Sequence, residues 1–210
     1  MSTELRAQVP SLKIMKRMII LASASKARSL ILTSCGLRHK VVVSGAYEIS
    51  GKGLALSALV IKNARAKAEK VASRYERAVI ISADTLVRMG KSIIGKPKTE
   101  KEAKRLLGKF SGKRVEVFTG LFLIDTASGK NVCGYEKSLV CVESLTAHEI
   151  ETIFRLLGPY DKAGGFSIEG VGSMVFDNIR GSYFNIIGLP MVLLRKLFKK
   201  LGLEITDFIK

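Results

Sequence analysis

Two charged residues at a short spacing suggest a site that handles phosphate. Asp84 closes the apolar run AVIISAD, and Lys96 follows it twelve positions later in IIGKPKT. The β-branched run is typical of a buried strand, and open α/β sheets bind ligands outside the carboxyl ends of their strands. A carboxylate and an ammonium group there could hold a metal ion and a phosphate, and a buried structural Asp–Lys pair is the competing interpretation.

A second polar group lies where an apolar run gives way to a helical pattern. Ser23 and Ser25 in LASASKAR fall at the predicted helix N-terminus, where backbone N–H groups and the helix dipole favour a phosphate. Arg28 can add positive charge to such a site. An ordinary serine cap with a solvent-facing arginine explains the local pattern equally well.

Several common chemistries lack the residues that they need. The chain has no GxxxxGK[ST] motif and no glycine-rich dinucleotide loop. His39 and His148 are the only histidines, and neither has a second histidine at ligand spacing or a recognisable nucleophile nearby in the sequence. We expect both on the surface. Carboxylates and cations around a phosphate-binding loop remain, and they favour magnesium-assisted phosphoryl chemistry.

Composition limits the class of protein and its partners. With 210 residues and 47% hydrophobic content, the chain can bury one core, or one core split into two lobes by a cleft. No window is long and apolar enough for a membrane span. Three cysteines without metal spacing suit a reducing cytosol, and we expect them to be buried small side chains. The net charge of +17 favours a polyanionic partner, either a phosphorylated small molecule or nucleic acid, although solvated helix faces explain most of the basic residues equally simply.

The hydrophobic periodicity alternates between strand and helix. Strands are predicted at 18–23, 39–45, 78–84, 113–125 and 132–144, with a hairpin at 87–95, and helices at 26–36, 54–75, 99–110, 146–158 and 188–202. The first five elements form a βαβαβ unit. The helices at 99–110 and 146–158 are predicted to be capped by Thr99, with Glu102 three residues later, and by Thr146. A glycine-rich polar stretch at 159–190 cannot be one regular element, and we expect it to line a site. We assign residues 1–17 to an N-terminal extension and residues 18–210 to a single catalytic domain.

Seven blocks of the sequence, in this order, carry a family resemblance: LASASKAR, YEIS, ISADTLV, IIGKPKT, LLGKFSGKRVEVFTG, YDKAGGFSIEG and IRGSYFNIIGLP. Together they resemble the Maf family of nucleoside triphosphate pyrophosphatases. The resemblance implies an α/β fold with a mixed twisted sheet flanked by helices and two lobes around a central cleft, as in inosine triphosphatases. It also implies a cytoplasmic enzyme, often a homodimer, that uses a divalent metal cation, Mg²⁺ or Mn²⁺, to release pyrophosphate.

The resemblance also assigns roles to individual residues. Asp84 becomes the proton acceptor and a metal-facing acid, and Glu48 the second carboxylate near the metal. The residues implied to hold the triphosphate are Ser23, Ser25, Arg28, Lys67, Lys96, Asp161 and Lys162.

Three positions that the resemblance links to base choice give a mixed answer. Thr85 follows the pattern of members that prefer pyrimidine nucleotides, dTTP or UTP. Glu169 follows that of members that prefer 7-methyl-GTP, and Ala27 follows neither. The base is therefore left open, with removal of non-standard nucleotides as the expected purpose. The alternative is a non-catalytic nucleic-acid-binding protein on the same scaffold, suggested by the charge of +17 and by an arginine that the family pattern has where this chain has Ala27.

Overall fold

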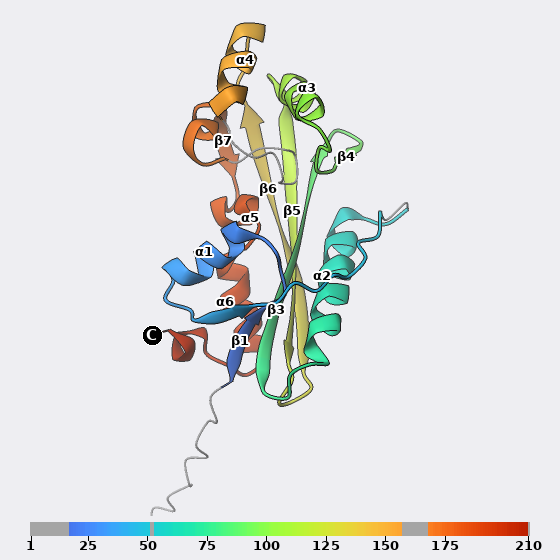
Figure 1. Ribbon diagram of the computed structural model, residues 1–210, viewed down its shortest axis with the longest axis vertical. Helices are drawn as coiled ribbons and strands as arrows, with labels where there is room; N and C mark the ends of the chain where they lie inside the picture. Colours follow the sequence, from blue (N-terminus) through green and yellow to red (C-terminus); the bar gives the residue numbers. More distant parts are fainter. Residues whose placement is uncertain (1–16, 51–52, 157–167, 210) are drawn as a thin grey trace, which may run out of the picture.

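The computed structural model describes residues 17–50, 53–156 and 168–209. Its centre is a seven-stranded mixed sheet of order β2-β1-β3-β5-β6-β7, with β4 paired to β3 (Figure 1). The strands are β1 (Met18–Leu21), β2 (His39–Val41), β3 (Ala78–Met89), β4 (Ser92–Ile94), β5 (Arg114–Asp125), β6 (Asn131–Val142) and β7 (Phe176–Arg180). The helices are α1 (Lys26–Ser34), α2 (Leu56–Ala72), α3 (Glu100–Phe110), α4 (Ala147–Leu156), α5 (Tyr183–Ile187) and α6 (Met191–Lys200), with 3₁₀ turns at Gly170–Met174 and Ile205–Phe208.

The predicted βαβαβ opening is confirmed, because β1 lies between β2 and β3 and pairs in parallel with both. The strand that carries Asp84 is longer than expected. Its parallel pairing to β1 stops at Ile81, but β3 continues to Met89 against β5, with Asp84 opposite Gly120. The prediction that a strand ends at Asp84 is therefore wrong. Beyond Ile81, β3 has lost β1 as a neighbour, so Asp84 still lies where one edge of the strand opens.

Helix α2 packs unusually close to the sheet. A Cβ atom added at Gly120 of β5 would come within 2.6 Å of the carbonyl carbon of Val60 on α2. No real side chain tolerates that distance, so glycine at this position lets the helix backbone approach the strand directly. Helix α2 covers one face of the sheet, while α5 and α6 lie on the opposite face (Figure 1).

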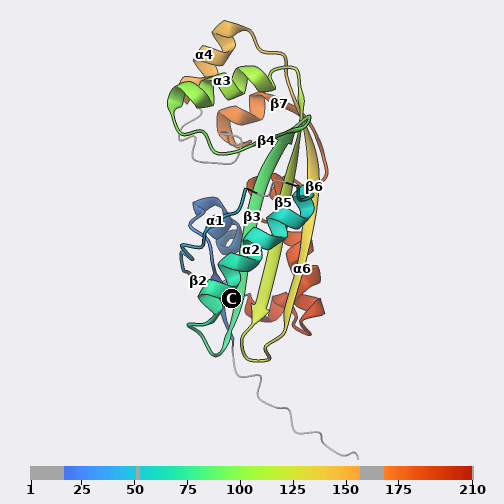
Figure 2. The same cartoon turned by 90° about the vertical axis from the view of Figure 1, so that its right-hand side faces the viewer.

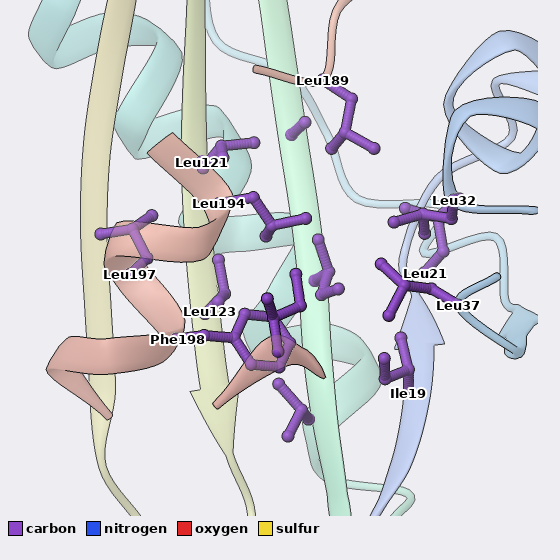
Figure 3. Close-up of a cluster of buried hydrophobic side chains, with 14 of the residues drawn as sticks. Ile19, Leu21, Leu32, Leu37, Leu121, Leu123, Leu189, Leu194, Leu197 and Phe198 are labelled. Carbon is purple, nitrogen blue, oxygen red and sulfur yellow. The ribbon is translucent and has the colours of Figure 1, made fainter. Parts of the chain in front are cut away.

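The expected division into two lobes is confirmed (Figure 2). In the lower lobe, the largest core cluster joins α1 and α6 to the sheet and includes Ile19, Leu21, Leu123, Leu197 and Phe198 (Figure 3). In the upper lobe, a second cluster joins α3 and α4 to the far ends of the long strands. The strands β3 and β5 contribute to both clusters, so the same sheet carries both lobes.

The two helices of the upper lobe begin at the predicted caps. Thr99 accepts a hydrogen bond from the backbone of Glu102, and Thr146 accepts one from Glu149, whose carboxylate bonds back to the Thr146 N–H. The described part of the glycine-rich stretch contains β7 and α5, two short elements that the sequence pattern did not reveal. Cys133 is exposed and the other two cysteines are half-buried, so the expectation of buried cysteines is wrong.

None of the described helices is both long and apolar enough to span a membrane.

At the foot of the sheet, a buried carboxylate binds the residue that precedes β1. Asp125 accepts a 2.7 Å ionic hydrogen bond from Nε of Arg17 and a second hydrogen bond from Ser128. Burial alone would raise the pKa of Asp125, but the bonds from Arg17, Ser128 and the Ala127 backbone outweigh it, and its pKa is lowered.

This lowered pKa predicts a pH-dependent stability. A carboxyl group whose folded pKa is depressed stabilises the fold above its unfolded pKa, here 3.8, and the contribution is lost as the pH falls through the folded value. We expect Asp125→Asn to lower the free energy of unfolding at neutral pH by roughly 2 kcal/mol. Melting curves of both proteins should show the difference in Tm closing as the pH falls through the folded pKa of Asp125. A gap of equal size at all pH values would contradict the assignment.

Candidate active site

A cleft of about 1220 Å³ lies between the two lobes. Most of its charged and hydroxyl side chains come from the lower lobe, from the loop after β1 and α1, the loop after β2, α2 and β3, and Lys96, Glu169 and Tyr183 add to them. Its apolar lining includes six residues of the upper-lobe cluster, Val87, Phe110, Val115, Val117, Val140 and Phe176, together with apolar residues of α1, α5 and the loop after β2. The cleft thus offers a charged region suited to a polyphosphate and an apolar region suited to a ring system.

Two carboxylates meet at one lysine in the charged region. Nζ of Lys67 lies 2.7 Å from Oδ1 of Asp84 and 2.7 Å from Oε1 of Glu48. Asp84 is only 4% exposed, whereas Glu48 projects from the loop after β2 into the open cleft. The ionic partner of Asp84 is therefore Lys67 on α2 and not Lys96, which the sequence spacing had paired with it.

Positive charge around Glu48 keeps this carboxylate ionised. Burial pushes its pKa upward, but the hydrogen bond and charge of Lys67, with the charges of Lys96 and Arg28, outweigh burial and hold the pKa below its usual range. Lys96 is exposed on the cleft wall. The expected set of cations around the carboxylates is therefore present in this region.

Arg28 is buried, with 9% of its surface exposed, so the interpretation of a solvent-facing arginine is wrong. Its guanidinium donates to Oγ of Ser23, to the carbonyls of Ala83 and Gly188, and to Oγ1 of Thr85, over 2.8 to 3.0 Å. Burial lowers the pKa of Arg28, and the negative charges of Asp84 and Glu48 offset part of that effect. The arginine ties the loop after β1 to β3 and to the end of α5.

The two serines of the first loop have protein partners as well as cleft positions. Ser25 is the N-cap of α1, and its hydroxyl accepts from the backbone N–H of Arg28. Oγ of Ser23 accepts from the backbone of Ser25 and from Arg28. Both line the cleft, so the capping role that the sequence left open exists beside any role in phosphate binding.

Thr85 lies at the head of a chain of hydroxyl groups. Its Oγ1 accepts from Arg28 and lies 3.0 Å from Oγ1 of Thr119, which donates its proton to the carbonyl of Asn185. Because Thr119 has one proton and has used it, Thr85 must donate to Thr119. Thr85 can therefore offer a ligand its remaining lone pair and its methyl group, but no proton.

The other two predicted specificity residues also line the cleft. Ala27 lies in the first turn of α1, and Glu169 precedes the 3₁₀ turn at Gly170–Met174. Burial raises the pKa of Tyr183 at the start of α5, and the negative charge of Glu169 raises it further. Asp161 and Lys162 lie outside the described residues.

Sequence reasoning missed one residue, Asn63, that holds the carboxylate of Asp84. Asn63 lies one helical turn before Lys67 on α2 and donates to Oδ2 of Asp84 over 3.0 Å. The four-residue spacing between Asn63 and Lys67 places both on one helix face, and this signal could have found Asn63.

The two histidines lie outside the cleft lining. His148 is exposed as expected, but His39 is half-buried. Its Nδ1 donates to the Leu37 carbonyl, so Nε2 accepts from Ser29. His39 thus hydrogen-bonds to Ser29, and neither residue lines the cleft.

The donor set fits a metal ion that arrives with a phosphorylated ligand. Among the described residues, no cluster of three or more His, Cys, Asp or Glu side chains could hold an ion by itself. Asp84 and Glu48 nevertheless converge on one cation, the Lys67 ammonium. Mg²⁺ is commonly bound by one or two carboxylates together with substrate phosphates, and these two side chains could supply that share.

The fold and the cleft assign this protein to the α/β proteins that carry a charged cleft between two lobes. Comparison with known proteins supports this class. The structure of the Ham1 protein of Staphylococcus aureus matches with a TM-score of 0.50 and 13% identity, covering 88% of this chain and all of that one, so the two share a fold. Residues 18–201 match the model of the Maf-like protein family. The chain belongs to this family, and the family resemblance read from the sequence is confirmed.

Relatives in the family are similar over nearly their whole length. A protein of Desulforamulus reducens is 39% identical over 190 residues, covering 90% of this chain and 100% of the relative. A protein of Dictyoglomus thermophilum is 40% identical, covering 90% of this chain and 98% of the relative. Both are named dTTP/UTP pyrophosphatase.

Proposed function

We propose that this protein is a nucleoside triphosphate pyrophosphatase that prefers pyrimidine nucleotides. The observation that carries the proposal is the buried Asp84 beside Lys67 and Glu48, inside a cleft with an apolar wall. The names of its relatives support the same activity and give no support to the nucleic-acid-binding alternative.

In the proposed reaction, a water molecule attacks the α-phosphorus of the nucleotide. The new bond joins the water oxygen to phosphorus, and the bond from phosphorus to the α,β-bridging oxygen breaks to release pyrophosphate. Asp84 accepts the proton of the attacking water. Lys67 and Lys96 neutralise the charge that develops on the leaving pyrophosphate.

Asp84 and Glu48 would hold a divalent cation, Mg²⁺ or Mn²⁺, which when bound supplies charge neutralisation at the phosphates. Ser23 and Ser25 would bind phosphate oxygens at the N-terminus of α1. Four N–H bonds of Arg28 already go to protein oxygens, which leaves one of its five for a ligand. Arg28 therefore contributes mainly its charge and the shape of the loop. The role of Asp161 and Lys162 in substrate binding stays a prediction.

The hydrogen-bond capacities of Thr85 and Glu169 fit a base edge that presents a donor, which both pyrimidines and guanine have, so the preference for pyrimidines rests on the names of the relatives. Thr85 offers only an acceptor, because its proton goes to Thr119, and an ionised Glu169 also only accepts. Either side chain could accept a hydrogen bond from the N3–H group of uracil or thymine. Ala27, in the first turn of α1, presents only a methyl group to the cleft, and this small side chain leaves room for a ring.

The activity is tested with a panel of nucleoside triphosphates incubated with Mg²⁺ or Mn²⁺. Separation of the products should yield monophosphate and pyrophosphate, fastest from dTTP and UTP. No turnover of any triphosphate, together with salt-sensitive binding of RNA or DNA, would overturn the enzyme assignment in favour of the alternative.

Changing Glu169 tests whether it contacts the base. Glu169→Gln adds an N–H donor where the carboxylate could only accept, so it should favour bases with a carbonyl acceptor at the matching edge. We expect the ratio of kcat/KM for UTP over 7-methyl-GTP to rise about tenfold, in keeping with about 1.4 kcal/mol for one hydrogen bond. An unchanged ratio would show that Glu169 does not face the base.

Three further expectations accompany the proposal. A homodimer would show as twice the chain mass in light scattering. The three free cysteines suit a reducing compartment, and we place the enzyme in the cytoplasm. The purpose we propose is removal of non-standard nucleotides.

A further inference from the structure

Asn63 is a buried amide that contacts both parts of the proposed catalytic centre. It is 4% exposed and extends from α2 toward β3 and the loop after β2. Its Oδ1 accepts from the backbone N–H of Ile49 over 3.0 Å, and its Nδ2 donates to the Ile49 carbonyl and to Oδ2 of Asp84. Ile49 is the residue directly after Glu48, so one side chain joins the Asp84 carboxylate to the backbone beside Glu48.

The orientation of this amide is fixed by its partners. Rotating it by 180° would place Oδ1 against the carboxylate of Asp84 and the two donors against the N–H of Ile49, which repels on both sides. In the observed orientation both hydrogen atoms and the oxygen have partners. Asn63 therefore donates to one oxygen of the Asp84 carboxylate, Oδ2, while Lys67 donates to the other, Oδ1.

The loop that carries Glu48 has no regular secondary structure of its own from residue 42 to residue 50. Helix α2 holds it with side chains at helical spacing. Asn63 bonds to Ile49, Lys67 pairs with Glu48, and Lys70 donates to the carbonyl of Gly45. Asn63 is buried, Lys67 is half-buried and Lys70 is exposed. Asn63 and Lys67 each also bond to Asp84.

We propose that Asn63 is a positioning residue that holds Glu48 and Asp84 in their relative places by clamping the loop at residues 44–50 to the side of β3. The inference rests on the proposed pyrophosphatase function, because it assigns a role within that site. A displacement of about 1 Å at a catalytic group can lower turnover by roughly a hundredfold, so a residue that only holds others in place can have a large effect.

Two variants separate the contacts of Asn63. Asn63→Ala removes all of them. Asn63→Asp keeps the shape and an oxygen for the Ile49 N–H, but it replaces the donor to Asp84 by a carboxylate oxygen. Ser82→Ala is the matched control, because Ser82 is also fully buried between α2 and the sheet and bonds to Ala64 and Phe122 without touching Asp84.

Turnover and hydrogen exchange are measured on the full chain at a temperature at which all variants are folded. We expect kcat to fall by on the order of a hundredfold in both Asn63 variants, with a much smaller change in KM. Amide exchange at residues 44–50 should accelerate at least about tenfold in Asn63→Ala and less in Asn63→Asp. Ser82→Ala should lower Tm but leave kcat and the loop exchange near wild-type values.

Turnover of Asn63→Ala within about threefold of Ser82→Ala would overturn the proposal, and so would unchanged exchange at residues 44–50. Exchange needs no substrate, so it still tests the clamp if the wild-type protein cleaves no triphosphate. That last result would contradict the proposed function and not the link between Asn63 and the loop.

Discussion

Asp84→Asn should lower turnover by on the order of a hundredfold or more while the protein stays folded. The amide cannot accept the proton of the attacking water, and it supplies one neutral oxygen where a carboxylate could face a metal ion. Lys67 keeps a partner in Glu48, so the substitution does not leave a buried unpaired ammonium. The measurement is the rate of pyrophosphate release at saturating substrate.

Asp125→Asn provides the matched control for this substitution. Asp125 is also a buried carboxylate with an ionic partner, Arg17, but it lies at the foot of the sheet outside the cleft lining. Both variants should lose stability, and only Asp84→Asn should lose turnover. Near-normal activity in Asp84→Asn would remove Asp84 from the mechanism, whatever its effect on Tm.

Arg28→Lys should destabilise the fold more than its conservative character suggests. A lysine keeps the charge, but its single ammonium cannot replace a planar group that bonds to oxygens in four directions. At least two buried acceptors would lose a partner, at about 1–3 kcal/mol each. We expect the free energy of unfolding to fall by roughly 3 kcal/mol and Tm by about 6–12 °C.

The surroundings of Arg28 leave little room for compensation. Gly188 has a φ of +105°, and a Cβ atom there would lie 2.9 Å from Oγ1 of Thr85 and 3.3 Å from Nε of Arg28. Thermal unfolding should be compared with Arg65→Lys, a change at an arginine of α2 whose side chain is 61% exposed and which should lower Tm much less. An equal Tm for the two variants would show that the bonds of Arg28 contribute little.

The sequence pattern was sufficient for most of the long elements and for singling out Asp84. Alternating residues predicted β5 and β6 nearly to their ends, and the capping signals at Thr99 and Thr146 placed the starts of α3 and α4 to within a residue. Asp84 stood out because an ionisable group is costly in an apolar run unless it has a partner or a function.

Partners across the fold were harder to predict. The partner of Asp84 is Lys67, seventeen residues earlier and on another element, and spacing along the chain favoured Lys96. Arg28 could be solvent-facing or buried, because only the return of the chain at Ala83 and Gly188 supplies the acceptors that make burial tolerable. The end of β3 was misplaced because Asp84 interrupts the apolar run, although pairing with β5 continues past it.

The contact between Gly120 and α2 has a consequence for the whole cleft. Helix α2 carries Asn63 and Lys67, and the depth at which it lies on the sheet is set by the missing side chain on β5. A single methyl group at position 120 would push α2 away from the sheet. Asn63 and Lys67 would then move away from the carboxylate of Asp84. The geometry of the proposed site could therefore be altered by mutation at Gly120, which lies opposite Asp84 in the β3–β5 ladder but is not one of the residues that line the cleft.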